Sequence, residues 1–234
     1  MIHETRPLTL MSTLAVKGAL TESVLPAFER HHGLAVNATF DPTNVLLERI
    51  VRGERASVMV AVTSAIDDLI AQRVLSPRGA RAIVRTGIGV AVASDASVPP
   101  LRTVDELKRC LLAAKSVAYS RSGASGVYFA TLLGRLGIAQ QIDTNATVIP
   151  KGFTGECVTR GDADVAIQQL SELAMVSGVK IAGPLPEEVQ SYTCFSIAAF
   201  AGADETPETE ALLLALDSPA ARDAYEKFGL ECLD

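Results

Sequence analysis

Short apolar runs alternate along the chain with amphipathic segments of helical period. Helical spacing is clearest in 20–31, which ends before Gly33, a natural C-cap, and in 103–114, which opens with a capping box formed by Thr103 and Glu106. Eight apolar runs have the length and composition of β-strands: 7–12, 34–40, 57–63, 88–94, 116–120, 146–150, 164–168 and 192–201. The alternation predicts an α/β protein whose mostly parallel sheets carry helices on both sides.

The composition fits a protein with a large buried core. The chain has 234 residues, of which 48% are apolar and 21% charged, and it contains no Trp. Its net charge is −6 and no basic stripe is visible, so we expect no nucleic-acid partner. No apolar run approaches the roughly 20 residues that a membrane-spanning helix needs.

The cysteines and the first residues indicate the cellular setting. Four cysteines are widely spread without CxxC or Cys/His spacing, so we expect ordinary thiols and no metal site: Cys110, Cys157, Cys194 and Cys232. No secretory signal precedes the first strand, which predicts a cytoplasmic protein. A periplasmic chain from which a signal peptide has been removed would begin in the same way.

The loops that follow strands are the places to look for a ligand site. In open α/β sheets, ligands bind beyond the carboxyl ends of the strands, where loops lead into helix N-termini. The first such loop begins with Ser12 and Thr13, the second contains Thr43 and Asn44, and Thr63 ends the third strand. Their hydroxyls and amides can bind a ligand; serving only as helix N-caps is the alternative.

Two later loops are richer in donors. The segment 119–126 carries Ser122, Ser125 and Gly126 before a helix, which suits a carboxylate or an oxyanion, whereas a simple turn is the alternative. It is neither a Walker A loop nor a GxGxxG loop, and we expect no cofactor. The next loop contains Phe153 and Thr154.

Several charged or polar residues complete the candidate set. Gln169 ends a buried strand and Arg85 is the cation expected beside the ligand, although an ordinary surface arginine is equally compatible with the sequence. A Ser/His/Asp triad is not expected, because the three histidines lie at 3, 31 and 32. Five loop residues can move protons, and the sequence does not choose among them: Lys17, Asp41, Tyr119, Lys151 and Glu156.

The order of several motifs resembles a known family. The strand and small-residue loop 9–12 lead into a helix ending in Ala27-Phe28-Glu29-Arg30, the stretch 160–167 reads Arg-Gly-Asp-Ala-Asp-Val-Ala-Ile, and 218–221 reads Ser-Pro-Ala-Ala. Together they resemble the molybdate-binding-protein-like solute receptors, which are type II periplasmic binding proteins. Each motif is loose, but their succession covers most of the chain.

The resemblance implies a two-lobed type II periplasmic-binding-protein-like fold with two hinge crossings. Residues 1–86 and 192–234 would form lobe one, 87–191 lobe two, and an anion would bind in the cleft between them. Ser12, then Thr43 or Asn44, then 122–126, then Phe153 and Thr154 match the family's four contacts. Gln169 stands near where many molybdate binders have a tyrosine, and 120–126 lacks their proline-rich pattern, so an organic carboxylate is as compatible as an oxyanion.

Two classes of function follow from this resemblance. The first is a solute-binding or sensing protein for a small di- or tricarboxylate or an oxyanion, which would meet a transporter permease only if the protein is exported. The second is a cytoplasmic isomerase of an unsaturated carboxylate, similar to aconitate isomerase, which would need a residue that moves protons. The absence of an export signal favours the enzyme, and the absence of an obvious catalytic set favours the receptor.

Overall fold

The computed structural model describes residues 8–233, which divide into two compact units. Unit 1 combines the chain up to Arg85 with the chain from Cys194 onwards, and unit 2 comprises Thr86–Thr193. The lobe bounds expected from the sequence were 1–86, 87–191 and 192–234. Pro7, expected to begin the first strand, lies outside the described residues. Each unit contains its own sheet and its own core.

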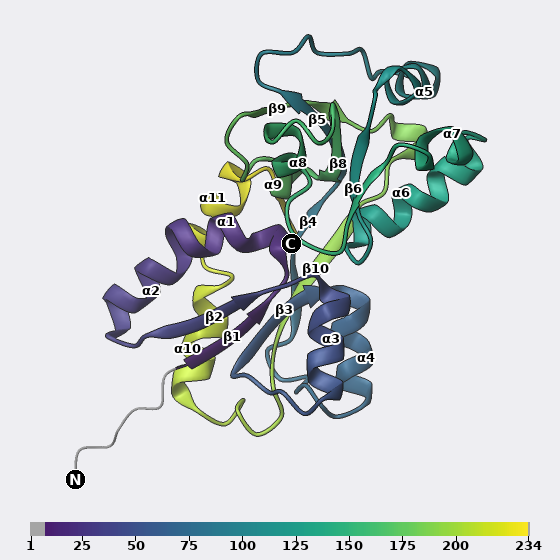
Figure 1. The fold of residues 1–234 in the computed structure, drawn as a ribbon. Helices are drawn as coiled ribbons and strands as arrows, with labels where there is room; N and C mark the ends of the chain where they lie inside the picture. Colours follow the sequence, from purple (N-terminus) through teal and green to yellow (C-terminus); the bar gives the residue numbers. More distant parts are fainter. Residues whose placement is uncertain (1–7, 234) are drawn as a thin grey trace. The chain divides into compact units, whose positions relative to one another are not determined.

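The unit 1 sheet has six strands in the order β11-β4-β10-β3-β1-β2. Strand β1 is parallel to both β2 and β3, whereas β10 is antiparallel to β3 and β11 to β4. The parallel arrangement expected from the sequence is thus found in three neighbouring strands (Figure 1). The strands are β1 (Leu8–Ser12), β2 (Val36–Phe40), β3 (Val58–Val62), β4 (Arg81–Thr86), β10 (Thr193–Ala199) and β11 (Glu231–Cys232).

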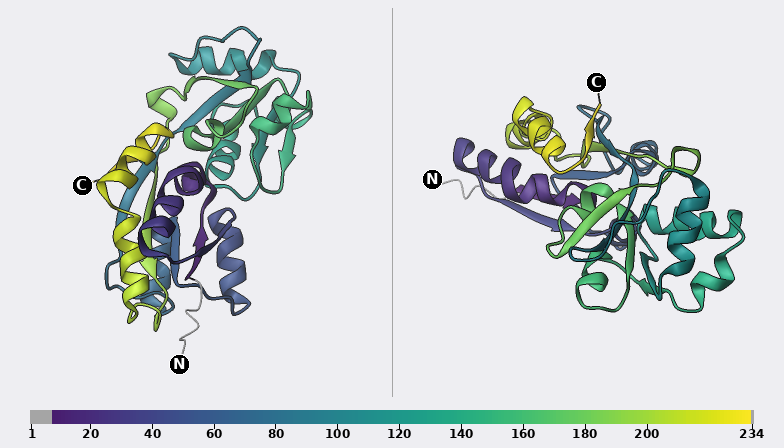
Figure 2. Two further views of the ribbon diagram at one scale, coloured as in Figure 1. Left: turned by 90° about the vertical axis from the view of Figure 1, so that its left-hand side faces the viewer. Right: turned by 90° about the horizontal axis from the view of Figure 1, so that it is seen from above.

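Helices cover both faces of this sheet because its inner strands are apolar on both sides. Leu10 and Val60 pack with a helical stretch that follows β1 and with α10 and α11, whereas Met11 and Met59 pack against α3 and α4 (Figure 2). The helical stretch comprises η1 (Leu14–Val16), α1 (Lys17–Ala19), η2 (Leu20–Val24) and α2 (Leu25–His32). The other helices are α3 (Thr43–Val51), α4 (Thr63–Ala71), α10 (Pro207–Ala215) and α11 (Pro219–Lys227).

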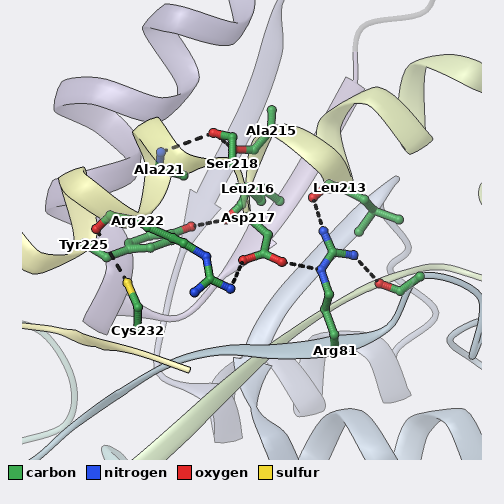
Figure 3. Close-up of polar contacts among 11 residues, drawn as sticks. Arg81, Leu213, Ala215, Leu216, Asp217, Ser218, Ala221, Arg222, Tyr225 and Cys232 are labelled. Atoms are coloured by element: carbon green, nitrogen blue, oxygen red, sulfur yellow. Dashed lines mark hydrogen bonds and ion pairs between the residues drawn. The ribbon is translucent and has the colours of Figure 1, made fainter. Parts of the chain in front are cut away.

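An ion-pair network ties β4 to the C-terminal helices of unit 1 (Figure 3). Asp217, which is largely buried between α10 and α11, accepts a 2.6 Å hydrogen bond from Arg81 Nε on β4. Its second oxygen lies 3.1 Å from Arg222 Nη2, an ion pair without the alignment of a hydrogen bond. The buried Tyr225 hydroxyl donates to the carbonyl of Leu216, and burial raises the pKa of that hydroxyl. The attraction of the two guanidinium groups compensates for the free-energy cost of burying the Asp217 carboxylate.

The unit 2 sheet has five strands in the order β7-β6-β8-β5-β9. Strand β6 is parallel to β7 and β8, whereas β5 is antiparallel to β8 and β9. Its elements in chain order are β5 (Ile88–Ala93), α5 (Val104–Ala113), β6 (Val117–Ser120), α6 (Ala124–Arg135), α7 (Ala139–Asp143), β7 (Thr147–Ile149), α8 (Gly155–Thr159), β8 (Val165–Gln169), α9 (Leu170–Leu173), β9 (Val179–Pro184) and η3 (Glu187–Val189).

Residues that alternate along the unit 2 strands enter two different cores. Val165 and Ile167 of β8 pack with α5, α6 and α7, whereas Ala166 between them packs with α8 and α9. A strand buried on both faces reads as a continuous apolar run, which is why β8 was visible in the sequence.

The local signals for helix ends are found as predicted, with one difference. Gly33 caps α2 in the left-handed conformation, with φ +67°. Thr103 caps α5 by accepting a hydrogen bond from the backbone N–H of Glu106. The Glu106 carboxylate, however, accepts from the N–H of Arg102 rather than from that of Thr103, so the capping box is not reciprocal. All four cysteines are free thiols.

No helix among residues 8–233 is both long enough and apolar enough to cross a bilayer.

Candidate functional site

In unit 1, three neighbouring parallel strands end at one edge of the sheet. Ser12, the last residue of β1, pairs in register with Phe40 of β2 and with Val60 of β3. The chain then stays close to this edge, because Thr13 N–H donates to the carbonyl of Val60 and Asp41 N–H donates to that of Ser12. The loops after β1, β2 and β3 are therefore neighbours.

These loops bring together five of the predicted site residues, which we call the unit 1 cluster: Ser12, Thr13, Thr43, Asn44 and Thr63. Ser12 and Thr13 are buried, and Asn44 is exposed in the first turn of α3. Thr43 accepts a hydrogen bond from Val62 N–H at 3.3 Å, which ties the α3 start to the end of β3. Thr63 begins α4 rather than ending a strand, and its hydroxyl lies 2.9 Å from that of Ser196.

Arg85, predicted as the cation beside the ligand, lies elsewhere in unit 1. Its guanidinium forms a 2.7 Å ion pair with Glu231, its cross-strand neighbour on β11. Strand β10 separates β4 from the three parallel strands.

Lys17 places an ammonium near the unit 1 cluster. Lys17 Nζ lies 5.8 Å from the ring centroid of Phe40, the last residue of β2. Asp41, the next residue along the chain, is held by Arg49 in an ion pair of 2.9 Å. An ammonium at this edge can pair with the carboxylate of a ligand.

In unit 2, the parallel strands β7, β6 and β8 also end at one edge of their sheet. The loop between β6 and α6 is fixed at this edge by three hydrogen bonds. Arg121 N–H donates to the carbonyl of Ile149, Ser122 Oγ donates to that of Pro150 at 2.6 Å, and Gly123 N–H donates to Ser120 Oγ. The β6–α6 and β7–α8 loops are therefore adjacent.

Gly126 lets helix α6 begin directly against the end of β6. A Cβ atom at this position would lie 1.8 Å from the backbone oxygen of Ser120, which is far inside van der Waals contact. Ser125 beside it is buried. The first N–H groups of a twelve-residue helix have no carbonyl within the helix to bond, so this end carries partial positive charge.

The fourth predicted loop is held from inside by a glutamine. Gln168 Oε1 accepts hydrogen bonds from both the N–H and the hydroxyl of Thr154, at 2.7 and 3.0 Å, and its Nε2 donates to the carbonyl of Gly152. Thr154 is completely buried, and both its donors are engaged with Gln168. Phe153 is half-buried, and Gln169 is buried as the last residue of β8. We call Ser122, Ser125, Gly126, Phe153, Thr154 and Gln169 the unit 2 cluster.

The proton-transfer candidates of unit 2 differ in their surroundings. The Tyr119 hydroxyl donates to Asp143 on α7, and burial raises the pKa of Tyr119 to about 12. Glu156 is exposed beside Arg160 on α8, and Lys151 is exposed in the loop after β7. Tyr119 therefore faces the core side of α7 and holds its proton firmly.

Glu172 is a buried acid that the sequence reasoning missed. It lies in α9, directly after β8, with 7% of its surface exposed. Burial raises the pKa of its carboxyl to about 8, while hydrogen bonds from the Gln168 side chain and the Gln169 backbone oppose this rise. A glutamate is ordinarily exposed to water, so the sequence pattern around Glu172 gave no indication that its side chain is buried.

No group of three or more His, Cys, Asp or Glu side chains in the described part of the chain is arranged to hold a metal ion. His31 and His32 are exposed at the end of α2, where His32 stacks on Phe28.

Comparison with known proteins identifies the family. A family model described as bacterial extracellular solute-binding protein matches residues 8–231, which is nearly the whole chain. The chain belongs to this family. The solute-binding protein has the type II periplasmic-binding-protein fold, as the sequence resemblance implied.

Its solved neighbours share the fold at low sequence identity. The periplasmic molybdate-binding protein of Azotobacter vinelandii superposes with a TM-score of 0.79 at 16% identity, covering 97% of this chain and 100% of its own. The sulfate-binding protein SubI of Mycobacterium tuberculosis H37Rv superposes with a TM-score of 0.74 at 16% identity, covering 97% and 87%. A characterised relative is more similar in sequence: an aconitate isomerase of Pseudomonas sp is 34% identical over 230 residues, which are 96% of this chain and 87% of the relative.

Proposed function

We propose that this solute-binding protein binds a small organic carboxylate carrying two or three negative charges, and that aconitate is the first compound to test. The observation that carries the proposal is the gathering of hydroxyls and helix starts where three parallel strands end, in unit 1 and again in unit 2. Such groups stabilise anions without any net positive charge on the protein.

The named relatives support an anion and favour a carboxylate. Two fold neighbours are named for molybdate and sulfate, which are both anions. The relative that is 34% identical is named for an isomerase of aconitate, a tricarboxylate. Gln169, where many molybdate binders have a tyrosine, fits a ligand other than a tetrahedral oxyanion.

In this proposal each cluster, taken by itself, offers groups that suit an anion. Ser12 and Thr13 offer hydroxyls and Lys17 offers a charge at the unit 1 edge. The first amides of α6, around Ser125, offer N–H donors at the unit 2 edge. Thr154 supports its loop through Gln168 and does not itself donate to the ligand.

A second candidate function, favoured by the characterised relative, is isomerisation of aconitate. Moving the double bond requires that a base remove a proton from the carbon next to it and that a proton be delivered to the far end of the allylic unit. As the proton leaves, the double bond shifts to include the carbon that lost it, and the far carbon of the allylic unit gains a proton. One proton is lost and one is gained, so no oxidant or reductant is consumed. We propose Lys17 for contact with the reacting carboxylate, because its ammonium lies at the edge where β1 and β2 end, 5.8 Å from the ring centroid of Phe40.

One experiment tests binding and catalysis together. Thermal denaturation is measured with molybdate, sulfate, citrate, cis-aconitate and trans-aconitate, each at increasing concentration. A ligand at about a hundredfold excess over its Kd stabilises the folded protein by about 2.7 kcal/mol, which raises Tm visibly. Proton NMR in heavy water then follows each aconitate isomer. Interconversion with deuterium uptake supports the isomerase, and stabilisation with an unchanged spectrum supports a receptor. No stabilisation by any carboxylate would refute the proposal.

Lys17 has a matched control elsewhere in unit 1. Lys227 also lies over an aromatic ring, with Nζ 5.9 Å from the centroid of Phe228. It is the last residue of α11, whereas the unit 1 cluster follows strands β1, β2 and β3. We expect Lys17→Met to weaken aconitate binding at least about tenfold, corresponding to about 1.4 kcal/mol, and Lys227→Met to leave it unchanged. Equal effects of the two substitutions would exclude a specific role for Lys17.

A further inference from the structure

Unit 1 contains a pocket at the end of its sheet opposite the unit 1 cluster. The pocket measures about 510 Å³ and is lined by the start of β1, by residues 55–57 before β3, and by residues of the stretch 202–209, which leads into α10. Leu8 is the first residue of β1 and Ser12 the last, so the pocket and the cluster lie at opposite ends of one strand. Ligand pockets commonly measure about 300–1,000 Å³, so this one is large enough for a small molecule.

Arg55 brings to this pocket a guanidinium that is fixed in place but only partly bonded. Its Nη1 donates to the carbonyls of Ile50 and Glu54, at 2.9 and 2.8 Å, which anchors the side chain at the end of α3. The Glu54 carboxylate is itself bound to Arg49. Within residues 8–233, no carboxylate forms an ion pair with Arg55, and its Nε and Nη2 have no acceptor. One edge of a guanidinium carries N–H groups spaced to bind both oxygens of a carboxylate.

Glu208 places a carboxylate on the same pocket. It is exposed in the first turn of α10, and it forms no ion pair with Arg55 or with any other residue in the described part of the chain. A simple anion would be attracted by Arg55 but repelled by Glu208. A ligand that carries both a carboxylate and an ammonium can satisfy the two side chains together.

Four hydroxyl groups add neutral polar atoms to the lining. The hydroxyls of Thr206 and Thr209 lie 2.8 Å apart, and those of Thr9 and Ser57 lie 3.4 Å apart. The backbone N–H groups of Thr9 and Ser57 each donate to the hydroxyl of the other residue, which fixes both side chains. A hydroxyl oxygen has two acceptor sites, so these groups can accept from an ammonium in addition to the bonds that they already make.

We propose that this pocket is a second binding site and that its ligand is a small zwitterion of the α-amino acid class. Arg55 binds the carboxylate of the ligand through Nε and Nη2, and Glu208 binds its ammonium. The inference does not depend on the proposed function, because the pocket shares no residue with the unit 1 cluster or the unit 2 cluster.

Calorimetric titration of the full chain with each of the common L-amino acids tests the proposal. We expect at least one of them to bind. That amino acid is then compared with its N-acetyl derivative, which lacks the ammonium, and with its carboxamide, which lacks the carboxylate. Each derivative should bind at least about tenfold more weakly than the parent, because each loses hydrogen bonds to a charged group.

Two pairs of substitutions locate the bound amino acid. Arg55→Met and Glu208→Gln should each weaken binding at least about tenfold. Arg52→Met and Glu210→Gln are the matched controls and should leave the affinity unchanged, since both residues are exposed on the same elements but do not line the pocket. Arg55→Lys retains the charge without the planar fork, and its weaker binding decides the role of Arg55 even if Arg55→Met fails to fold.

The outcomes keep this site distinct from the proposed anion site. Absence of binding by every amino acid overturns the second site, and equal binding of the parent and either derivative overturns the zwitterion. If Lys17→Met weakens binding of the amino acid and Arg55→Lys does not, the compound occupies the unit 1 cluster and the inference about the pocket is refuted. Aconitate affinity should be the same in Arg55→Lys and the wild type, so that either site can fail without the other.

Discussion

Replacing Glu172 by Gln should make the protein more stable at neutral and alkaline pH. In the folded protein, burial raises the pKa of this carboxyl to about 8, whereas the ordinary value in an unfolded chain is 4.5. Between these values the unfolded chain has released the proton that the folded protein retains. The unfolded state therefore binds fewer protons, and the Glu172 contribution to stability is lost progressively as the pH rises from about 4.5 to 8.

The size of this effect follows from the two pKa values. One pKa unit corresponds to about 1.4 kcal/mol, so the shift of Glu172 costs about 5 kcal/mol of folding free energy once the pH exceeds 8, and about 3 kcal/mol at pH 7. Near pH 4.5 the cost almost disappears. Gln at this position has nearly the same size and a polar amide, but it carries no charge at any pH.

The assay is urea denaturation followed by circular dichroism, with the free energy of unfolding measured from pH 5 to pH 8. We expect Glu172→Gln to gain several kcal/mol over the wild type at pH 8 and little at pH 5. Subtracting the two proteins removes the pH dependence of all other groups. Glu156→Gln, which removes an exposed carboxylate, should track the wild type throughout. A difference between Glu172→Gln and the wild type that is constant over this pH range would refute the reasoning.

Three further substitutions test other parts of the structure. Asp217→Asn removes the charge shared by two arginines, and we expect the free energy of unfolding to fall by about 3 kcal/mol in urea titrations; no change would mean that the network does not stabilise unit 1. Gly126→Ala places a methyl 1.8 Å from the Ser120 oxygen, so calorimetry should show aconitate binding weakened at least about tenfold; unchanged affinity would exclude close contact there. Thr103→Ala removes the cap on Glu106 N–H and should cost about 1 kcal/mol in thermal denaturation, whereas an unaltered Tm would show the cap to be dispensable.

The eight strands predicted from the sequence are present because each is apolar along most of its length. Strands β4, β9 and β11 were missed for identifiable reasons. Strand β4 begins with Arg81 and contains Arg85, so it reads as a polar segment, and β9 is only half-buried. Strand β11 has two residues, and it forms only because the chain returns to pair with β4. Edge strands depend on long-range pairing that local pattern does not reveal.

The candidate site was predictable as a set of loops but not as a set of contacts. Parallel strands bring their carboxyl ends together, so Ser12 and Thr43 of unit 1 become neighbours by topology alone. The partner of Arg85 is Glu231, 146 residues further along the chain, and spacing cannot indicate such a pair. The same applies to Thr154, whose donors are taken by Gln168 inside the protein.

The sheet of unit 1 cannot be completed before residues 193–232 have been synthesised. Strand β10, next to β3 in the sheet, and helices α10 and α11, which cover one of its faces, all follow residue 192. Unit 2 lies between the two parts of unit 1 in the sequence and is synthesised after the first part and before the second. During synthesis, the apolar face that carries Leu10 and Val60 is therefore covered only by the helical stretch 14–32 until α10 and α11 have been made, which leaves part of this face exposed in the nascent chain.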